Sequence, residues 1–105
     1  MTPRRMGYAT LAVLQALTDG HRYGFDIADQ TGLATGTVYP ALSGLERRGY
    51  VEADWEEEET AHADRRPARK YYRVTQEGRA ALREALSRLG ALGLRTGPAE
   101  AEAAG

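Results

Sequence analysis

The chain contains no cysteine among its 105 residues. This absence excludes disulfide bonds, thiolate zinc sites and cysteine nucleophiles, and it fits a reducing compartment. No apolar run approaches the roughly 20 residues that a membrane span requires, and the first residues lack the apolar density of a signal peptide. We therefore expect a cytoplasmic protein with one small hydrophobic core and no membrane partner.

Recognisable catalytic and metal-binding patterns are also absent from the sequence. The two histidines, His21 and His62, stand in no metal or catalytic-triad spacing, so we expect both to be plain surface residues. The acidic run Glu56–Glu59 does not favour a metal site, because neighbouring residues on a strand point to opposite sides. We expect no metal and no other cofactor, and an enzyme is the least favoured class of function.

The charges are separated along the chain although the net charge is only -1. Residues 51–64 contain seven acidic side chains and no Lys or Arg, whereas residues 65–73 contain five basic side chains and no acid. Such adjoining blocks indicate two differently charged faces of one element. A nucleic-acid partner therefore stays compatible with the composition.

Helical periodicity begins early in the chain. Residues 9–17 carry leucines at a spacing of three with alanines between them, and Gly20 follows as a stop signal. Residues 23–32 predict a second helix of barely two turns, which would be marginal on its own. These segments predict two short helices packed into one core.

A third helix is expected to end at Gly49, but its start is ambiguous. With Thr37 as the N-cap, Pro40 lies three residues in, where its missing N–H has no intrahelical partner in any case. With a start at Thr35, Pro40 lies beyond the free first turn and should loosen the helix. The sequence leaves both starts open.

A hairpin and a last helix should follow. Residues 50–56 alternate with period two and predict a half-buried strand, residues 58–68 are polar and turn-like, and residues 70–74 favour a second strand. Thr75 is a good cap for a helix over residues 76–92, whose apolar stripe consists of Leu82, Ala85, Leu86, Leu89 and Leu92. The fold class is therefore mainly α with a small β-hairpin.

This order of elements is that of a winged helix-turn-helix, in which the third helix enters the DNA major groove and the hairpin is the wing. The buried positions of the third helix leave an opposite face that is small at its start and basic at its end. Taken singly, Gly36 and Pro40 are equally well explained as residues that mark the start of a helix. The prediction of DNA contact therefore rests on the face as a whole. The predicted DNA contacts on this helix are Thr35, Gly36, Thr37, Tyr39, Pro40, Ser43 and Arg47.

The basic block falls on the predicted wing. Arg65 and Arg66 lie near its tip and are predicted to contact DNA, although a solvated basic loop is the commoner reading of a charge run. We expect the remaining basic residues, Arg69, Lys70 and Arg73, to pair with the carboxylates of Glu56–Glu59. Trp55, Tyr71 and Tyr72 could line a ligand pocket, but packing of the wing onto the body is the favoured interpretation.

Three segments together resemble the PadR family of bacterial transcriptional regulators. They are RYGFDI (residues 22–27), GTVYPALSGLERRGYVEADW (residues 36–55) and RKYYRVTQEGRAAL (residues 69–82). The resemblance covers most of residues 9–90, and its GTVYPAL and KYY-x-VT-x-x-G pieces are fairly specific. It implies a short-subgroup regulator that acts as a homodimeric repressor on a roughly palindromic DNA operator, with a possible small-molecule effector of unknown identity.

The predicted organisation is a winged helix-turn-helix DNA-binding domain over residues 1–75, a dimerisation helix over residues 76–93 and a disordered tail over residues 94–105. The dimer interface is expected to use the stripe on the last helix. Two alternatives stay open: a MarR-like regulator, and a winged-helix protein-interaction module without operator binding. Retention on heparin followed by salt elution would separate the last from a DNA-binding protein.

Overall fold

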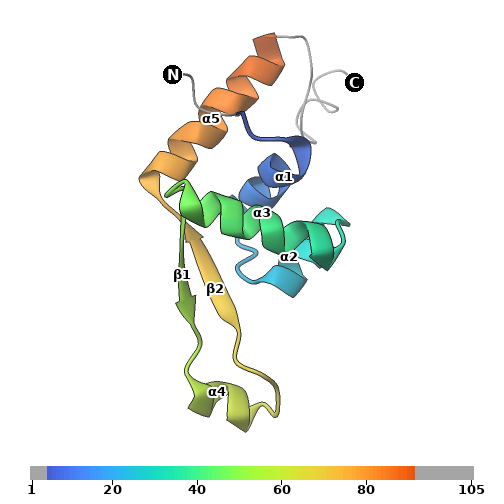
Figure 1. Cartoon of the computed structure of the whole chain (residues 1–105), viewed down its shortest axis with the longest axis vertical. Helices are drawn as coiled ribbons and strands as arrows, with labels where there is room; N and C mark the ends of the chain where they lie inside the picture. Colours follow the sequence, from blue (N-terminus) through green and yellow to red (C-terminus); the bar gives the residue numbers. More distant parts are fainter. Residues whose placement is uncertain (1–4, 92–105) are drawn as a thin grey trace.

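The computed structural model describes residues 5–91 and has the expected order of elements, with one addition (Figure 1). The predicted tail, residues 94–105, lies outside the described residues. No described helix has the length and apolar character to cross a membrane. The elements are α1 (Tyr8–Thr18), α2 (Gly24–Thr31), α3 (Thr35–Arg47), β1 (Val51–Trp55), α4 (Glu58–Ala63), β2 (Lys70–Val74) and α5 (Gln76–Ala91). This is the predicted winged helix-turn-helix, mainly helical with one two-stranded sheet.

The core lies where α1, α2 and α3 meet, and β2 and α5 close it. Each helix contributes apolar residues spaced at three or four, so one face of each can be buried. On α3 this spacing completely buries the inner side chains, and these are Val38, Leu42 and Leu45. Packing of this kind fixes the direction of the opposite face of α3.

The third helix begins at Thr35, the earlier of the two predicted starts. Its N-cap is Ala34, which has extended backbone and makes no side-chain cap, while its carbonyl accepts from the amides of Thr37 and Val38. The predicted threonine caps are therefore wrong. Pro40 lies inside the helix and cannot donate to the Gly36 carbonyl four residues back. The helix continues through this missing bond because Val38, Leu42 and Leu45 hold it against the core.

The wing is a two-stranded antiparallel hairpin with a longer and more ordered connection than predicted. The register pairs Val51 with Val74 at the base and Trp55 with Lys70 at the far end. The turn-like interpretation of residues 58–68 is partly wrong, because α4 forms there and buries Ala61. Figure 1 shows α4 at the end of the hairpin that is farthest from the helical body.

A compact junction joins α3, both strands and α5. The Thr75 hydroxyl donates to the Gly49 carbonyl at 2.7 Å and accepts from the Gly78 amide at 3.1 Å, so the predicted cap of the last helix is confirmed. The Thr75 amide donates to the Tyr50 carbonyl at 3.0 Å. A Cβ on Gly78 would lie 2.1 Å from that carbonyl oxygen, so this approach requires glycine. Gly49, with a φ of 77°, ends α3 as predicted.

The apolar stripe of α5 divides between the chain's own core and its surface. Leu82 and Ala85 are buried within the single chain, whereas Leu86 and Leu89 are half-buried. Leu92, the last member of the predicted stripe, lies outside the described residues. The first two residues therefore stabilise the body and have little surface left for a partner.

Candidate nucleic-acid interface

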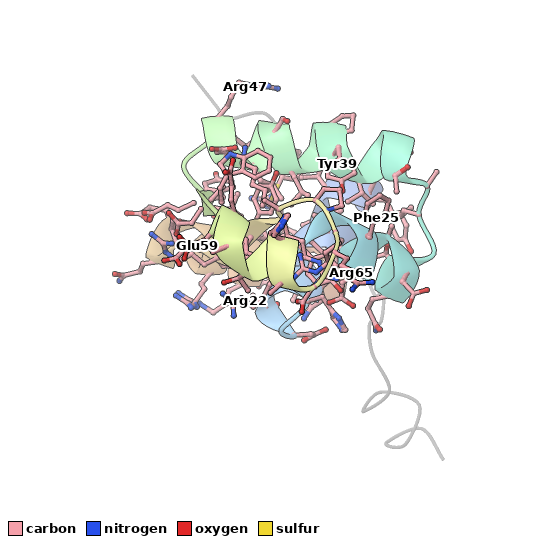
Figure 2. The ribbon with its side chains drawn as sticks, turned by 90° about the horizontal axis from the view of Figure 1, so that it is seen from below. Arg22, Phe25, Tyr39, Arg47, Glu59 and Arg65 are labelled. Atoms are coloured by element: carbon pink, nitrogen blue, oxygen red, sulfur yellow. The ribbon has the colours of Figure 1, made fainter. Side chains whose placement is uncertain are left out.

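The outer face of α3 is exposed along its whole length. Because the apolar residues of this helix point into the core, the polar and small residues between them point to solvent. Figure 2 shows Arg47 extending from one end of this face, away from the body. The exposed residues include every predicted contact on this helix, namely Thr35, Gly36, Thr37, Tyr39, Pro40, Ser43 and Arg47.

Tyr39 is held sideways against the start of α2. Its ring meets Phe25 edge to face with a centroid distance of 6.2 Å, and it lies directly over Gly24. A Cβ on Gly24 would lie 2.3 Å from the tyrosine ring, so the ring occupies space that any other residue would fill. Figure 2 shows Tyr39 and Phe25 near each other, on neighbouring helices. The sequence did not predict this contact.

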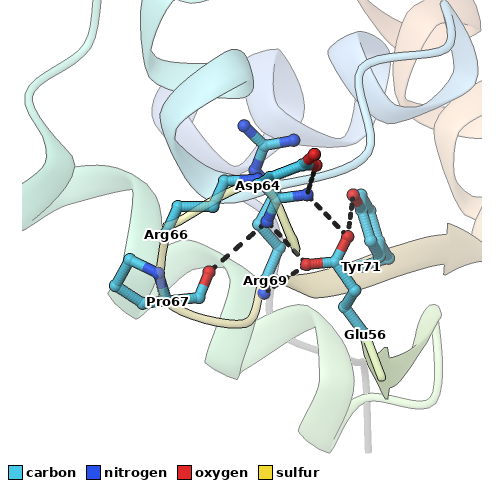
Figure 3. Close-up of polar contacts among 6 residues, drawn as sticks. All are labelled: Glu56, Asp64, Arg66, Pro67, Arg69 and Tyr71. Carbon is cyan, nitrogen blue, oxygen red and sulfur yellow. Dashed lines mark hydrogen bonds and ion pairs between the residues drawn. The ribbon is translucent and has the colours of Figure 1, made fainter. Parts of the chain in front are cut away.

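The wing contains a charged cluster centred on Glu56, which we call the Glu56 cluster (Figure 3). Arg66 donates two hydrogen bonds to the Glu56 carboxylate, at 2.6 and 2.8 Å. The Tyr71 hydroxyl and the Arg69 amide also donate to it, at 3.2 and 3.3 Å. The Glu56 side chain is only 9% exposed, so the pair lies largely out of water. The Glu56 cluster therefore fixes the connection after β1 to the start of β2.

These contacts shift the ionisation of the pair. The hydrogen bonds from Arg66 are the main reason that the pKa of Glu56 is lowered to about 2, against the opposing effect of burial. The same hydrogen bonds raise the pKa of Arg66. Arg66 also reaches Asp64 at 3.2 Å, so its guanidinium already binds two carboxylates of its own chain. Its predicted contact with DNA stays untested and would have to compete with these bonds.

The other basic side chains of the wing differ in how far they are neutralised. The predicted pairing of Arg73 with Glu56–Glu59 is wrong, because the hairpin register places it between Glu52 and Asp54. Lys70 pairs instead with Glu46 of α3, at 3.5 Å. The guanidinium of Arg69 lies 4.2 Å from the centre of the Tyr23 ring. Among residues 5–91 no carboxylate forms an ion pair with Arg69.

Arg65 is the exposed cation at the tip of the wing. It has a positive φ of 57° and comes after Asp64, the C-cap of α4, with its amide donating to the His62 carbonyl. Within the described part of the chain, no carboxylate forms an ion pair with its guanidinium. Of the two predicted wing arginines, Arg65 is thus the one whose charge is available to a partner.

The expectation for one histidine needs correction. His21 is half-buried and its Nδ1 lies 2.9 Å from the Asp26 carboxylate, so it is not a plain surface residue. This pair joins the α1–α2 connection to the first turn of α2. No group of three or more potential metal ligands occurs within residues 5–91.

A hollow of about 470 Å³ lies between α2, the start of α3 and the wing, and we call it the wing hollow. Tyr23, Gly24 and Phe25 line it on one side, and residues 66–70 line it on the other. Tyr39, Trp55 and Tyr72 complete its walls. The sequence named Trp55 and Tyr72 as possible pocket residues but missed the α2 side, because no periodic signal links residues 23–25 to the wing.

Comparison with known proteins places this arrangement in a family. The model of the PadR-like family of transcriptional regulators matches residues 13–84, which include all of α2, α3 and the wing. No curated protein sequence matches the chain.

Solved structures agree with the family match. A PadR family transcription regulator from hypervirulent Clostridium difficile superposes with a TM-score of 0.72 and 26% identity, covering 83% of this chain and 92% of that one. A PadR-like transcription factor from Bacteroides fragilis gives a TM-score of 0.67 and 26% identity, covering 80% of this chain and 82% of that one.

A MarR family regulator from Rhodococcus resembles the chain in fold alone. Its TM-score is 0.64 at 22% identity, with 82% of this chain and 56% of that one covered. The family model spans the wing and the helix that carries the exposed face, and it is the PadR-like one rather than the MarR one. The chain therefore belongs to the PadR-like family of transcriptional regulators.

Proposed function

We propose that the protein is a homodimeric repressor that occupies a roughly palindromic DNA operator and carries out no chemical step. The observation that carries this proposal is the exposed face of α3, which is small at its start and ends in Arg47. Small side chains let the helix backbone approach base edges, and a terminal arginine suits guanine or phosphate. Arg65 would add a contact from the wing, and the protein would act in the cytoplasm, where the DNA is.

The dimer would be formed through α5, with residues 1–75 as the DNA-binding domain and residues 76–93 as the dimerisation helix. Leu86 and Leu89 support this, because they are large apolar residues that the chain's own core covers only in part. A two-fold partner would bury the remaining surface of these two leucines. Pairing would also hold two recognition helices about 34 Å apart, the distance between successive major grooves on one side of the duplex.

A direct test first selects the fragments of genomic DNA that the protein binds. The affinity of the protein for the selected site is then measured by fluorescence anisotropy. Arg47→Ala should weaken specific binding by roughly 1 to 3 kcal/mol, the usual worth of a base contact. Tyr39→Phe should weaken it less, because only the hydroxyl is lost. Ser87→Ala, exposed on α5, is the matched control and should bind like the wild type.

Two results would contradict the proposed DNA binding. If no fragment is selected, and retention on heparin does not depend on salt, operator binding is excluded and a protein-interaction module becomes the better reading. If Arg47→Ala and Tyr39→Phe both bind the operator as tightly as the wild type, Arg47 and the Tyr39 hydroxyl do not contact the DNA.

The dimer is tested separately by analytical ultracentrifugation. Leu86→Glu with Leu89→Glu would place two charges in the proposed interface and should give a monomer that has lost tight operator binding. Ser87→Glu with Ala91→Glu adds the same charge at exposed positions of the same helix and should stay dimeric. A wild type that sediments as a monomer at micromolar concentration, or a leucine variant that stays dimeric, contradicts the proposed dimer.

A further inference from the structure

The wing hollow is unusual in the side chains that form it. Its walls carry five aromatic residues, which come from α2, α3 and both strands or their flanks, and these are Tyr23, Phe25, Tyr39, Trp55 and Tyr72. Its volume of about 470 Å³ lies within the range of small-molecule pockets. Aromatic faces on several walls suit a flat ring system better than a flexible chain.

Three of these five rings are exposed to solvent within the chain. Phe25 is 68% exposed, Trp55 is 67% exposed and Tyr39 is 40% exposed. Among residues 5–91 the large apolar side chains with such exposure are these three and Tyr8, so three of the four lie around one hollow. Scattered apolar residues need no explanation, but a cluster around a concave surface marks a binding site.

The charged residues that line the wing hollow favour a negatively charged ligand. Its lining contains Arg66, Arg69 and Lys70 and no acidic residue. Arg66 is neutralised by the Glu56 cluster and Lys70 by Glu46, but no ion pair with a described carboxylate neutralises Arg69. One positive charge thus stays uncompensated beside the aromatic walls, and a negatively charged ligand would be attracted to it.

We propose that the wing hollow binds a small anion carried on a flat, fused ring system. The ring would cover Phe25 and Trp55, and the anionic group would lie at Arg69. A purine nucleotide and a fused-ring aromatic acid share this chemistry.

Occupancy of the hollow should act on DNA binding through Tyr39, an inference that rests on the proposed function. Tyr39 belongs both to the exposed face of α3 and to the lining of the hollow. A ligand would hold this ring and would place a negative charge near the path of the DNA phosphates. Ligand and operator should therefore weaken each other's binding, and by the same factor.

The first experiment measures binding without DNA, by calorimetry and by the indole N–H signal of Trp55, the one tryptophan in the chain. The probes are naphthalenesulfonate and guanosine monophosphate, with uncharged naphthamide as the matched control. At least one anion should bind roughly tenfold more tightly than naphthamide, a difference of about 1.4 kcal/mol, and should shift the indole signal. The stronger of the two anions identifies the class of ligand.

Variants locate the site. Arg69→Gln should remove the preference for the anion, and Phe25→Ala should weaken anion and naphthamide alike. Arg79→Gln, an exposed arginine of α5 outside the hollow, removes the same charge and should change neither affinity. Phe25 is exposed, so its replacement should leave the fold intact, which amide spectra would verify.

The outcomes separate this proposal from the proposed function. Absence of binding by both anions, or binding that Arg69→Gln and Phe25→Ala leave unchanged, overturns the ligand site even if the protein binds its operator. Binding at the hollow by a protein that selects no DNA supports the site and contradicts the operator function. Binding of ligand and operator that proves independent refutes the coupling through Tyr39.

Discussion

Helix α3 and the wing are held in place by different forces. Apolar packing positions α3: Val38, Leu42 and Leu45 are completely buried, and the opposite face makes few contacts within the chain. Charge pairing positions much of the wing, where Glu56 receives hydrogen bonds from Arg66 and Tyr71. Sequence alone makes the wing look like the more basic surface. In the folded chain, however, much of that charge is neutralised by carboxylates of the wing and of α3.

This difference shows that a run of basic residues does not measure the charge offered to DNA. The block over residues 65–73 has five cations, but Arg66, Lys70 and Arg73 bind carboxylates of the same chain. Arg65 and Arg69 are left for partners. The helix has fewer charges, but Arg47 at its end is exposed, so the wing exceeds α3 in available positive charge by less than the sequence suggests.

Removal of apolar packing from α3 should have the largest effect. Leu42→Ala empties a fully buried position and should lower the free energy of unfolding by about 2 to 5 kcal/mol, measured by chemical denaturation. Ser43→Ala changes the next residue, on the exposed face, and should stay within about 0.5 kcal/mol of the wild type. Equal losses for both would show that packing does not set the position of this helix.

Overpacking of the junction should disturb helix and wing together. Gly78→Ala drives a methyl group into the Tyr50 carbonyl and should cost about 1 to 3 kcal/mol of unfolding free energy. Gly90→Ala is the matched change in the same helix, where the added methyl meets nothing within 4 Å. It should stabilise the helix by up to about 1 kcal/mol, because alanine is the better helix former. Chemical denaturation tests this: the free energy of unfolding should be lower for Gly78→Ala than for Gly90→Ala, and the opposite order would contradict the close contact at Gly78.

Acid should loosen the wing before it affects α3. The pKa of Glu56 is about 2 in the folded chain, below its usual 4.5, so the ionised carboxylate stabilises the fold at neutral pH. This contribution is complete above about pH 4.5 and is lost as the pH falls through about 2. Amide exchange of β1 and β2 should therefore rise across this range more than that of α3. Glu56→Gln should abolish the difference, and a wing with no acid response in the wild type would contradict the role of this pair.

The smallest expected effect compares the two arginines of the wing tip. Arg65→Ala should leave stability unchanged and reduce the salt dependence of DNA binding by about one unit of slope, the effect of one lost phosphate contact. Arg66→Ala should instead destabilise the hairpin with little change in slope, because its charge is neutralised within the chain. A lower slope for Arg66→Ala and none for Arg65→Ala would reverse this assignment.

Much of the fold was predictable because it depends on local patterns. Apolar spacing located α1, α2, α3 and α5, and the change of period at Gly49 located the hairpin. The stop at Gly49 and the cap at Thr75 were predicted from residue type and are confirmed. α4 was missed because a six-residue helix has too little periodicity to stand out.

The site was less predictable because its key contacts join distant residues. The exposure of the α3 face followed from helical spacing, but the bond between Glu56 and Arg66 spans ten residues across a connection of unknown shape. The contact of Tyr39 with Gly24 depends on the angle between two helices, which periodicity does not report. For the same reason Ala34 as the N-cap of α3 was not foreseen: core packing, rather than a side-chain cap, sets where that helix begins.

The junction at Thr75 has a mechanical meaning for a dimer built on α5. Thr75 bonds to Gly49 at the end of α3 and to Tyr50 before β1, while Gly78 sits against the Tyr50 carbonyl without an intervening side chain. Because this contact is between backbone atoms, no change of side-chain rotamer can compensate for a shift of α5 relative to Tyr50. If two α5 helices pair, each would therefore move as one rigid body with the α3 and the wing of its own chain. A change in the angle between the paired helices would change the spacing and orientation of the two α3 helices.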